Sequence, residues 1–193
     1  MKIDIIAGAR PNFIKIAPVI EAIKKKKDKI SFRLIHTGQH YDKNMSGNFF
    51  DELGIPMPDI NFNAGGGTQS EQTSKIMIKY ESLLMQNLPH LCMVFGDVTS
   101  TMACSIVAKK FNLKVAHIEA GIRSFDLSMP EEINRMVTDS ITDYFFTTSE
   151  YANNNLKNLG VKNDKIFYVG NTMIDSLIKN INRLKKPKLF DDL

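Results

Sequence analysis

Short apolar runs alternate with longer amphipathic segments along almost the whole chain. The first run, residues 2–8, is rich in isoleucine, and a segment with helical spacing follows from Pro11 to about Lys26. The apolar positions of that segment fall on one face of a helix: Phe13, Ile14, Ala17, Ile20 and Ile23. The pattern therefore predicts a strand that leads directly into a helix.

The same alternation continues to the end of the sequence. Further apolar runs predict strands at residues 31–38, 91–97, 113–119, 143–149 and 165–170. Helices are predicted before Gly54 and at residues 68–86 (capped by Thr68 or Ser70), 100–111, 130–141, 150–160 and 171–184. Strands that are joined through helices pair in parallel, so we predict an α/β fold: a doubly wound, mainly parallel, Rossmann-like sheet with helices on both faces.

Polar residues and glycines follow the predicted strands. In open parallel sheets, ligands bind outside the carboxyl ends of the strands, where the strand order reverses. The residues at these ends are Gly8, Arg10, Thr37, Gly38, Gln39, His40, Gly96, Asp97, Glu119, Gly121, Arg123, Gly170 and Asn171. The opposite ends of the strands show no comparable concentration. We therefore expect the functional site at the carboxyl edge.

Composition and charge narrow the class of protein. The chain has 193 residues, enough for one substantial domain, with 43% hydrophobic and 24% charged residues and a net charge of +4. Much of the excess lies in two lysine-rich runs, residues 24–27 and 183–188, which are typical of solvated helix ends. Aromatic residues are not interleaved with them, so we do not expect nucleic-acid binding.

Cysteine usage and hydropathy predict a cytoplasmic protein. Cys92 and Cys104 lie in apolar surroundings and are expected to be small core residues of a reduced protein. No apolar run has membrane-spanning length, so no membrane partner is expected, and the N-terminal run is too short for a signal peptide.

Arg10 and Lys15 place two cations beside a predicted helix N-terminus. Backbone N–H groups at such a terminus favour anions, so a diphosphate is one candidate ligand. The alternative is an arginine that fixes a loop and a lysine at the surface. Neither a Walker loop nor a G-x-G-x-x-G fingerprint occurs in the sequence.

Carboxylates follow two strands that are expected to be neighbours. Asp97 and Glu119 would face one another across a cleft, an arrangement that suits general acid–base chemistry. Alternatively, Asp97 caps the next helix, and Glu119 forms a salt bridge to Arg123 or Arg135. A further pair, residues 131–132, follows Pro130, where carboxylates are favoured by the helix dipole, so spacing alone makes this pair structural.

Histidines and nucleophiles show no recognisable grouping. The four histidines are spread over the chain, and no Ser–His–Asp or Cys–His arrangement with a nucleophile turn is present. Neither a metal nor a cofactor is therefore expected.

Six segments, taken in order, are similar to the motifs of one known family. They are GARPNFIKIAPVI, HTGQHYDKNM, GDVTST, HIEAGIRS, MPEEINR and VGNTMIDSL. Together they cover nearly all of the chain, which resembles the non-hydrolysing UDP-N-acetylglucosamine 2-epimerases. The resemblance implies an isomerase that interconverts UDP-GlcNAc and UDP-ManNAc. In that reaction the C2 proton is removed and UDP is expelled, and UDP then returns to the 2-acetamidoglucal as the proton is restored on the other face.

The resemblance also implies roles for individual residues. It makes Asp97, Glu119 and Glu131 the catalytic carboxylates. It places substrate binding at six residues: Arg10, Lys15, Gln39, His40, Arg123 and Arg135. Arg10 and Lys15 are expected to hold the departing diphosphate.

The same resemblance implies that the chain is half of a two-domain, GT-B-like protein. Residues 1–170 would form the Rossmann-like N-terminal domain, and residues 171–193 a helix leading into a second domain that is absent here. That second half normally supplies most uridine and phosphate contacts and a catalytic histidine. We therefore expect this chain to fold but not to turn over substrate alone.

Partners, regulation and substrate are less closely defined. Family members generally form homodimers, and the helices after Thr68 and Thr99 are the expected interface. Some bacterial members bind a second UDP-GlcNAc as activator through an Arg–Gln pair. In this chain, glycines at residues 65–67 replace that pair, so we do not expect this regulation.

The motifs also resemble relatives that act on UDP-2,3-diacetamido sugars of capsule and O-antigen pathways, so two classes of UDP-sugar are candidate substrates. A GT-B glycosyltransferase and a non-catalytic UDP-sugar-binding domain are the alternatives.

Overall fold

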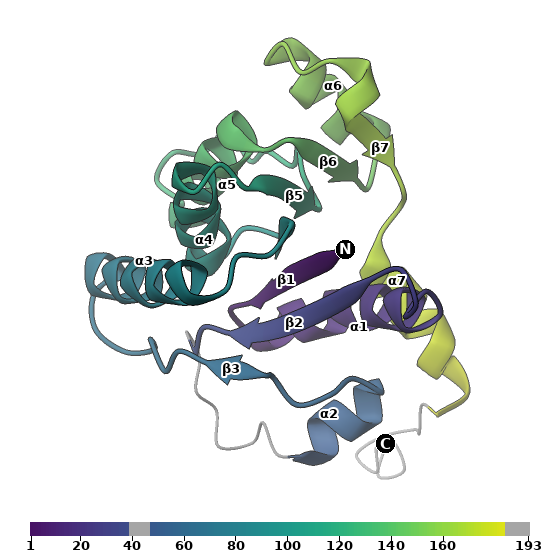
Figure 1. Ribbon diagram of the computed structural model, residues 1–193. Helices are drawn as coiled ribbons and strands as arrows, with labels where there is room; N and C mark the ends of the chain where they lie inside the picture. Colours follow the sequence, from purple (N-terminus) through teal and green to yellow (C-terminus); the bar gives the residue numbers. More distant parts are fainter. Residues whose placement is uncertain (39–46, 184–193) are drawn as a thin grey trace, which may run out of the picture.

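The computed structural model describes residues 1–38 and 47–183. Within these residues the strands form a seven-stranded sheet in the order β3-β2-β1-β4-β5-β6-β7, and each neighbouring pair is parallel (Figure 1). The strands are β1 Lys2–Ala7, β2 Ser31–His36, β3 Ile60–Asn61, β4 Leu91–Phe95, β5 Lys114–Ile118, β6 Tyr144–Thr147 and β7 Ile166–Tyr168. The predicted doubly wound, parallel α/β fold is confirmed.

Helices connect the strands. They are α1 Arg10–Lys24, α2 Gly47–Leu53, α3 Gln69–Gln86, α4 Thr99–Lys110, α5 Pro130–Ile141, α6 Glu150–Asn158 and α7 Thr172–Asn180, with short 3-10 turns at Asn163–Lys165 and Ile181–Arg183. The predicted helices are confirmed to within a few residues, and the bounds of α5 agree fully. The sequence did not predict β3, because a two-residue strand has no periodicity to detect.

The sheet separates two apolar layers. On one face, α1 and α2 pack on side chains such as Ile5, Leu34 and Phe95. On the other face, α3 and α4 pack on the alternate strand residues, including Ile6 and Val94. Alternate residues of a strand point to opposite faces, so each central strand supplies both layers, which is why these strands are mostly apolar.

The order of the strands fixes where a ligand site can form. The chain runs outward from β1 to β2 and β3, then returns to the other side of β1 to build β4, β5, β6 and β7. The carboxyl ends of β1 and β4 therefore border the point at which the order reverses. This edge carries Gly8, Gly96 and Asp97, as the sequence predicts.

A buried ion pair crosses the central strands. Arg33 on β2 donates from Nε and Nη2 to the two carboxylate oxygens of Asp4 on β1, at 2.9 and 2.7 Å. Tyr80 Oη on α3 donates to the same carboxylate at 3.2 Å. Asp4 is fully buried, so its charge depends on these donors.

Cys92 and Cys104 are free and fully buried in the layer below α3 and α4. Burial raises the pKa of the Cys92 thiol to about 12, so it stays protonated. Both are core residues, as predicted.

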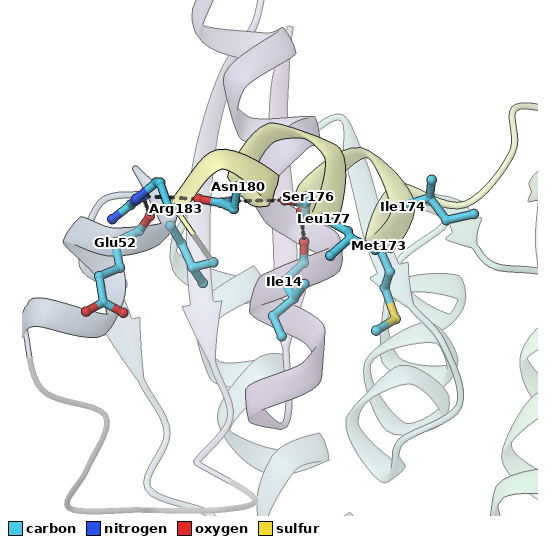
Figure 2. A pocket seen from close by; sticks show the side chains of 9 residues that line it. Ile14, Glu52, Met173, Ile174, Ser176, Leu177, Asn180 and Arg183 are labelled. Carbon is cyan, nitrogen blue, oxygen red and sulfur yellow. Dashed lines mark hydrogen bonds between the residues drawn. The ribbon is translucent and has the colours of Figure 1, made fainter. Parts of the chain in front are cut away.

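The last helix, α7, lies against α1 rather than beneath the sheet. Ser176 Oγ donates to the main-chain oxygen of Ile14 at 2.6 Å, and Lys179 forms an ion pair with Glu21 at 2.6 Å. A groove of about 650 Å³ separates parts of α7, α1 and α2 (Figure 2). Several apolar side chains of this segment are exposed, of which Ile174 and Leu177 line the groove and others are Ile178 and Ile181. None of the helices that the structure describes is long and apolar enough to cross a membrane.

The Asp4–Arg33 pair provides a test of the fold. The variant Asp4→Asn leaves a buried guanidinium without its counter-charge, so we expect a loss of about 3–5 kcal/mol in unfolding free energy, measured by urea denaturation. The control Lys25→Gln breaks an exposed ion pair with Glu21 and should leave the transition midpoint unchanged. Equal midpoints for the two variants would contradict the role of the buried pair.

Candidate active site

An ion pair joins α1 to the end of β5 at the carboxyl edge of the sheet. Lys15 Nζ lies 2.6 Å from Glu119 Oε2, and the two side chains are 11% and 23% exposed. Lys15 comes from one face of the sheet and reaches across its edge to the segment that follows β5. Glu119 therefore pairs with Lys15, not with Arg123 or Arg135, which were the alternatives from sequence.

Gly96 makes room for this lysine. A Cβ atom at Gly96 would lie 3.1 Å from Lys15 Nζ, and the residue has a φ of +63°, which favours glycine. The backbone is also fixed here, because Gly96 N–H donates to the Ile118 carbonyl at 2.9 Å. Gly96 thus ends β4, turns the chain toward Asp97 and leaves a passage for the ammonium group.

Glu119 occupies an unusual backbone conformation. Its φ is +73°, in a region that non-glycine residues seldom adopt. The next glycine, Gly121, also has a positive φ, and a Cβ there would lie 2.5 Å from the Ala152 carbonyl of α6. The turn after β5 is therefore held in a strained form by close packing, a feature that concentrates at functional sites.

Asp97 projects from the turn that follows β4. Its carboxylate pairs with the guanidinium of Arg135 on α5, and its main-chain oxygen accepts from Asn134 Nδ2 at 2.8 Å. The N-cap of α4 is Val98, without a side-chain cap, so the structure does not support the capping role for Asp97. The carboxylate is 28% exposed and is accessible to a ligand.

The two glutamates that open α5 have different surroundings. Glu132 is buried and accepts hydrogen bonds from Ser124 N–H at 2.9 Å and Phe125 N–H at 3.2 Å, and it pairs with Arg135 at 2.9 Å. Burial opposes its ionisation, but these donors outweigh burial and lower the pKa of Glu132. Glu131 is exposed. From spacing alone, both glutamates were predicted to be structural, and Glu132 has that role because it fixes the segment before α5. The catalytic role of Glu131 stays a prediction.

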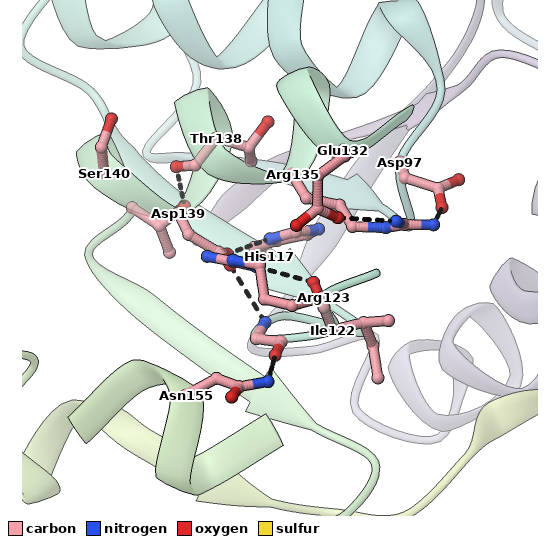
Figure 3. A network of polar contacts seen from close by, with 12 residues as sticks. Asp97, His117, Ile122, Arg123, Glu132, Arg135, Thr138, Asp139, Ser140 and Asn155 are labelled. Atoms are coloured by element: carbon pink, nitrogen blue, oxygen red, sulfur yellow. Dashed lines mark hydrogen bonds and ion pairs between the residues drawn. The ribbon is translucent and has the colours of Figure 1, made fainter. Parts of the chain in front are cut away.

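Behind the edge lies a buried polar cluster (Figure 3). His117 on β5 contacts Asp139 on α5 and the Gly96 carbonyl, and Asp139 also contacts Arg123. The Arg123 side chain is 5% exposed and packs inside the domain. Its role in substrate binding stays a prediction.

Arg10 and Asn12 are at the start of α1, directly after the turn that follows β1. Arg10 is exposed, and its guanidinium carbon lies 4.9 Å from the centre of the Phe49 ring. Asn12 was not predicted as a functional residue. Its Oδ1 accepts from Gly8 N–H and Ala9 N–H, both at 3.0 Å, and its Nδ2 donates to the Phe95 carbonyl at 3.2 Å. Asn12 thus links the turn after β1 to the end of β4.

Gln39 and His40 lie outside the described residues, so nothing tests their assignment. In the part of the chain that the structure describes, no group of three or more His, Cys, Asp or Glu side chains could hold a metal ion. A second hollow, of about 600 Å³, is lined by residues such as Phe125, Met136 and Leu159. The linings of the two hollows do not include Lys15, Asp97 or Glu119.

Comparisons with known proteins agree with this arrangement. A family model described as UDP-N-acetylglucosamine 2-epimerase matches residues 21–191. The UDP-N-acetylglucosamine 2-epimerase of Methanocaldococcus jannaschii is 46% identical over 96% of this chain and 50% of its own length. The UDP-2,3-diacetamido-2,3-dideoxy-D-glucuronate 2-epimerase of Pseudomonas aeruginosa is 44% identical over 97% of this chain and 53% of its own length. The chain thus spans about half the length of these relatives.

Solved structures give the same result. The Methanocaldococcus jannaschii UDP-GlcNAc 2-epimerase, solved with UDP-GlcNAc and UDP, superposes with a TM-score of 0.90 over 95% of this chain and 50% of that chain, at 46% identity. A lipopolysaccharide outer core galactosyltransferase, WaaB, superposes with a TM-score of 0.62 over 89% of this chain and 46% of that chain, at 16% identity, which shows the fold alone. The Rossmann-like half of a GT-B-like architecture is confirmed.

The adjacent pair Glu131 and Glu132 allows a matched test. We expect Glu132→Gln to lose about 2 kcal/mol of unfolding free energy at pH 7, because hydrogen bonds to a buried charge are lost, and Glu131→Gln to lose nothing. The pKa of folded Glu132 lies below its unfolded value, so this stabilisation is full above about pH 4.5 and disappears as the pH falls through the folded pKa. Urea denaturation at a series of pH values measures it. A pH-independent deficit in Glu132→Gln would show that the charge is not responsible.

Proposed function

Because the chain belongs to the UDP-N-acetylglucosamine 2-epimerase family, we propose that it is the N-terminal half of a nucleotide-sugar 2-epimerase. Residues 1–170 form its Rossmann-like domain, and residues 171–193 lead toward a second domain. The substrate is UDP-GlcNAc or a related UDP-2-acetamido sugar. The whole protein inverts carbon 2 by eliminating UDP and adding it back.

One observation carries this proposal: the Lys15–Glu119 ion pair at the reversal of strand order, with Asp97 on the adjacent turn. The C2 proton of the sugar is poorly acidic, since no carbonyl is adjacent to it. Its removal therefore needs a base that is already charged and in place while the C1–O bond breaks. A carboxylate held beside an ammonium group meets that requirement.

Arg10 and Lys15, two cations at the carboxyl edge of the sheet, could bind the negatively charged UDP that leaves the sugar. Arg10 is exposed at the first position of α1, where the helix dipole also favours an anion. Lys15 lies between this position and Glu119. Arg10 and Lys15 would therefore hold the diphosphate of UDP while the nearby carboxylates exchange the proton.

Asp97, Glu119 and Glu131 act as the catalytic carboxylates in this proposal. Asp97 and Glu119 end adjacent strands, and Asn134 ties the first turns of α5, where Glu131 lies, to the turn that carries Asp97. Arg135 orients Asp97 through their ion pair. The remaining proposed binding residues, by resemblance alone, are Gln39, His40, Arg123 and Arg135.

The identity of the sugar depends on relatives of two kinds. The chain is 46% identical to an enzyme named for UDP-N-acetylglucosamine and 44% identical to one named for a diacetamido glucuronate. Both sugars carry a 2-acetamido group, which is the feature we assign to the substrate. A role in capsule or O-antigen synthesis in the cytoplasm follows from the same resemblance.

A homodimer is part of the same proposal. The outer face of α3 carries exposed apolar side chains, among them Ile78 and Met85, at 62% and 75% exposure. Exposed apolar side chains on a helix are common at subunit interfaces. These side chains favour α3 as the interface, and the family resemblance adds its neighbour α4.

Deuterium incorporation provides the main test of the reaction. The two-domain protein, incubated with UDP-GlcNAc or the diacetamido sugar in deuterated water, should form the C2 epimer with deuterium at C2, measured by mass spectrometry and phosphorus NMR. A glycosyltransferase has no reason to exchange that proton. Transfer of the sugar to an acceptor without deuterium at C2 would favour the transferase.

Matched variants test the carboxylates in the same assay. Asp97→Asn and Glu119→Gln should each lower kcat about 10²–10⁴-fold, the range expected for a general acid or base. The control Asp164→Asn changes an exposed carboxylate far from the edge and should leave kcat unchanged. Residues 1–193 alone should release no UDP. Full activity in both carboxylate variants would leave only a sugar-binding role.

Two glycines separate backbone strain from crowding at the site. Gly96 and Gly160 both have a positive φ, but a Cβ at Gly160 meets nothing within 4 Å. Gly96→Ala and Gly160→Ala should each lose about 1–2 kcal/mol of unfolding free energy. Only Gly96→Ala should also lower kcat, by about tenfold or more, because its methyl group displaces Lys15. Equal kcat values in the two variants would count against the Lys15–Glu119 pair.

A further inference from the structure

His117 lies between the two turns that carry the candidate catalytic carboxylates. It is on β5, two residues before Glu119, and it is fully buried. Its Nδ1 lies 2.7 Å from Asp139 Oδ1, and its Nε2 lies 2.8 Å from the Gly96 carbonyl oxygen. Figure 3 shows the ring beside Asp139 and Arg123, between α5 and the strand ends.

Both ring nitrogens face atoms that accept hydrogen bonds. A main-chain carbonyl has no proton to donate, so Nε2 must carry one. A neutral imidazole has a single N–H, and in that case Nδ1 would direct its lone pair at the Asp139 carboxylate. At 2.7 Å two lone pairs repel, so the geometry calls for a proton on Nδ1 as well.

Asp139 does not supply that proton from its own acid form. Its other oxygen, Oδ2, accepts from Gly121 N–H at 3.1 Å and pairs with Arg123 Nη1 at 2.7 Å. The Gly121 N–H and the Arg123 guanidinium both stabilise the charged form of this carboxylate, whatever the state of the ring. The carboxylate is therefore ionised, and the proton between the two side chains lies on the imidazole.

The charged groups near His117 belong to several different elements of the fold. Asp139 belongs to α5, and Arg123 to the segment after β5. On the far side of Gly96 lies the Lys15–Glu119 pair, and beyond the same turn lies the Asp97–Arg135 pair. One anion therefore contacts the ring directly, and a buried charge needs such a partner.

The contacts of this pair reach both catalytic turns. His117 holds the carbonyl of Gly96, the residue before Asp97, while Asp139 holds the N–H of Gly121, two residues after Glu119. Gly96 N–H is bound to the Ile118 carbonyl, so the Gly96 residue is fixed through both its N–H and its C=O. Movement of the ring would shift Gly96, and with it the passage occupied by Lys15.

We propose that His117 is a positioning residue, an imidazolium that with Asp139 locks the turns bearing Asp97 and Glu119. Its kinetic consequence rests on the proposed epimerase function. The protonation state and the geometry do not, so the two can be tested apart. His117 does not contact the substrate.

Nitrogen NMR of the 193-residue chain tests the protonation state without any activity. Long-range proton–nitrogen spectra at pH 7 should show both ring nitrogens of His117 protonated. His36 is an internal reference, because burial lowers its pKa and favours the neutral ring. The signals are assigned by their loss in His117→Gln. An unprotonated nitrogen in His117 at neutral pH would overturn the proposal.

Kinetics of the two-domain protein test the positioning role. His117→Gln keeps an N–H that can reach Gly96 but loses the charge, and kcat should fall about 10–100-fold with KM changed less than about threefold. The control His90→Gln makes the same change at the opposite end of β4, where His90 accepts from Lys2 N–H, and should leave kcat unchanged. An unchanged kcat in His117→Gln would overturn the positioning role. An inactive parent protein would instead refute the epimerase proposal and leave the spectra as the deciding measurement.

Discussion

The candidate site depends on one ion pair that bridges two layers of the fold. Lys15 comes from the helix layer on one side of the sheet, and Glu119 ends a central strand. Their contact requires a residue without a side chain between them, which is Gly96, and a left-handed backbone at Glu119 itself. The tight packing of Gly121 against α6 holds the backbone in this strained conformation. The geometry of the carboxylate is therefore a product of the whole edge rather than of one loop.

Charge compensation explains how so many ionisable groups gather at this edge. Asp97 and Glu132 share Arg135, while Asp139 lies between His117 and Arg123. For the two buried carboxylates, Glu132 and Asp139, these partners outweigh desolvation and lower the pKa of each. Asp97 and Glu119, the carboxylates that follow β4 and β5, stay accessible. In the proposed two-domain protein, this edge would form one wall of the cleft between the domains.

The sequence predicts the secondary-structure elements and their layered arrangement better than it predicts the contacts between distant side chains. Periodicity and capping signals locate almost every element, and strand ends locate the site, because these depend on local pattern. Long-range partners have no local signal: Lys15 for Glu119, Arg135 for Asp97 and Asn12 for the end of β4 all required the fold. One alternative from spacing was that Asp97 caps α4, yet the cap position falls one residue later, at Val98. The different burial of Glu131 and Glu132 follows from the packing of α5, which neighbouring identical residues cannot reveal.

The contact between α7 and α1 has a mechanical consequence. Ser176 is bonded to the main chain at Ile14, the residue immediately before Lys15, and Lys179 is anchored about two turns farther along the same helix, at Glu21. The helix by which the chain leaves this half is thus clamped to the helix that presents the ammonium group. Any hinge rotation transmitted through α7 would act as a lever on α1. In the proposed two-domain protein, a movement of α7 would therefore also move the ammonium group of Lys15.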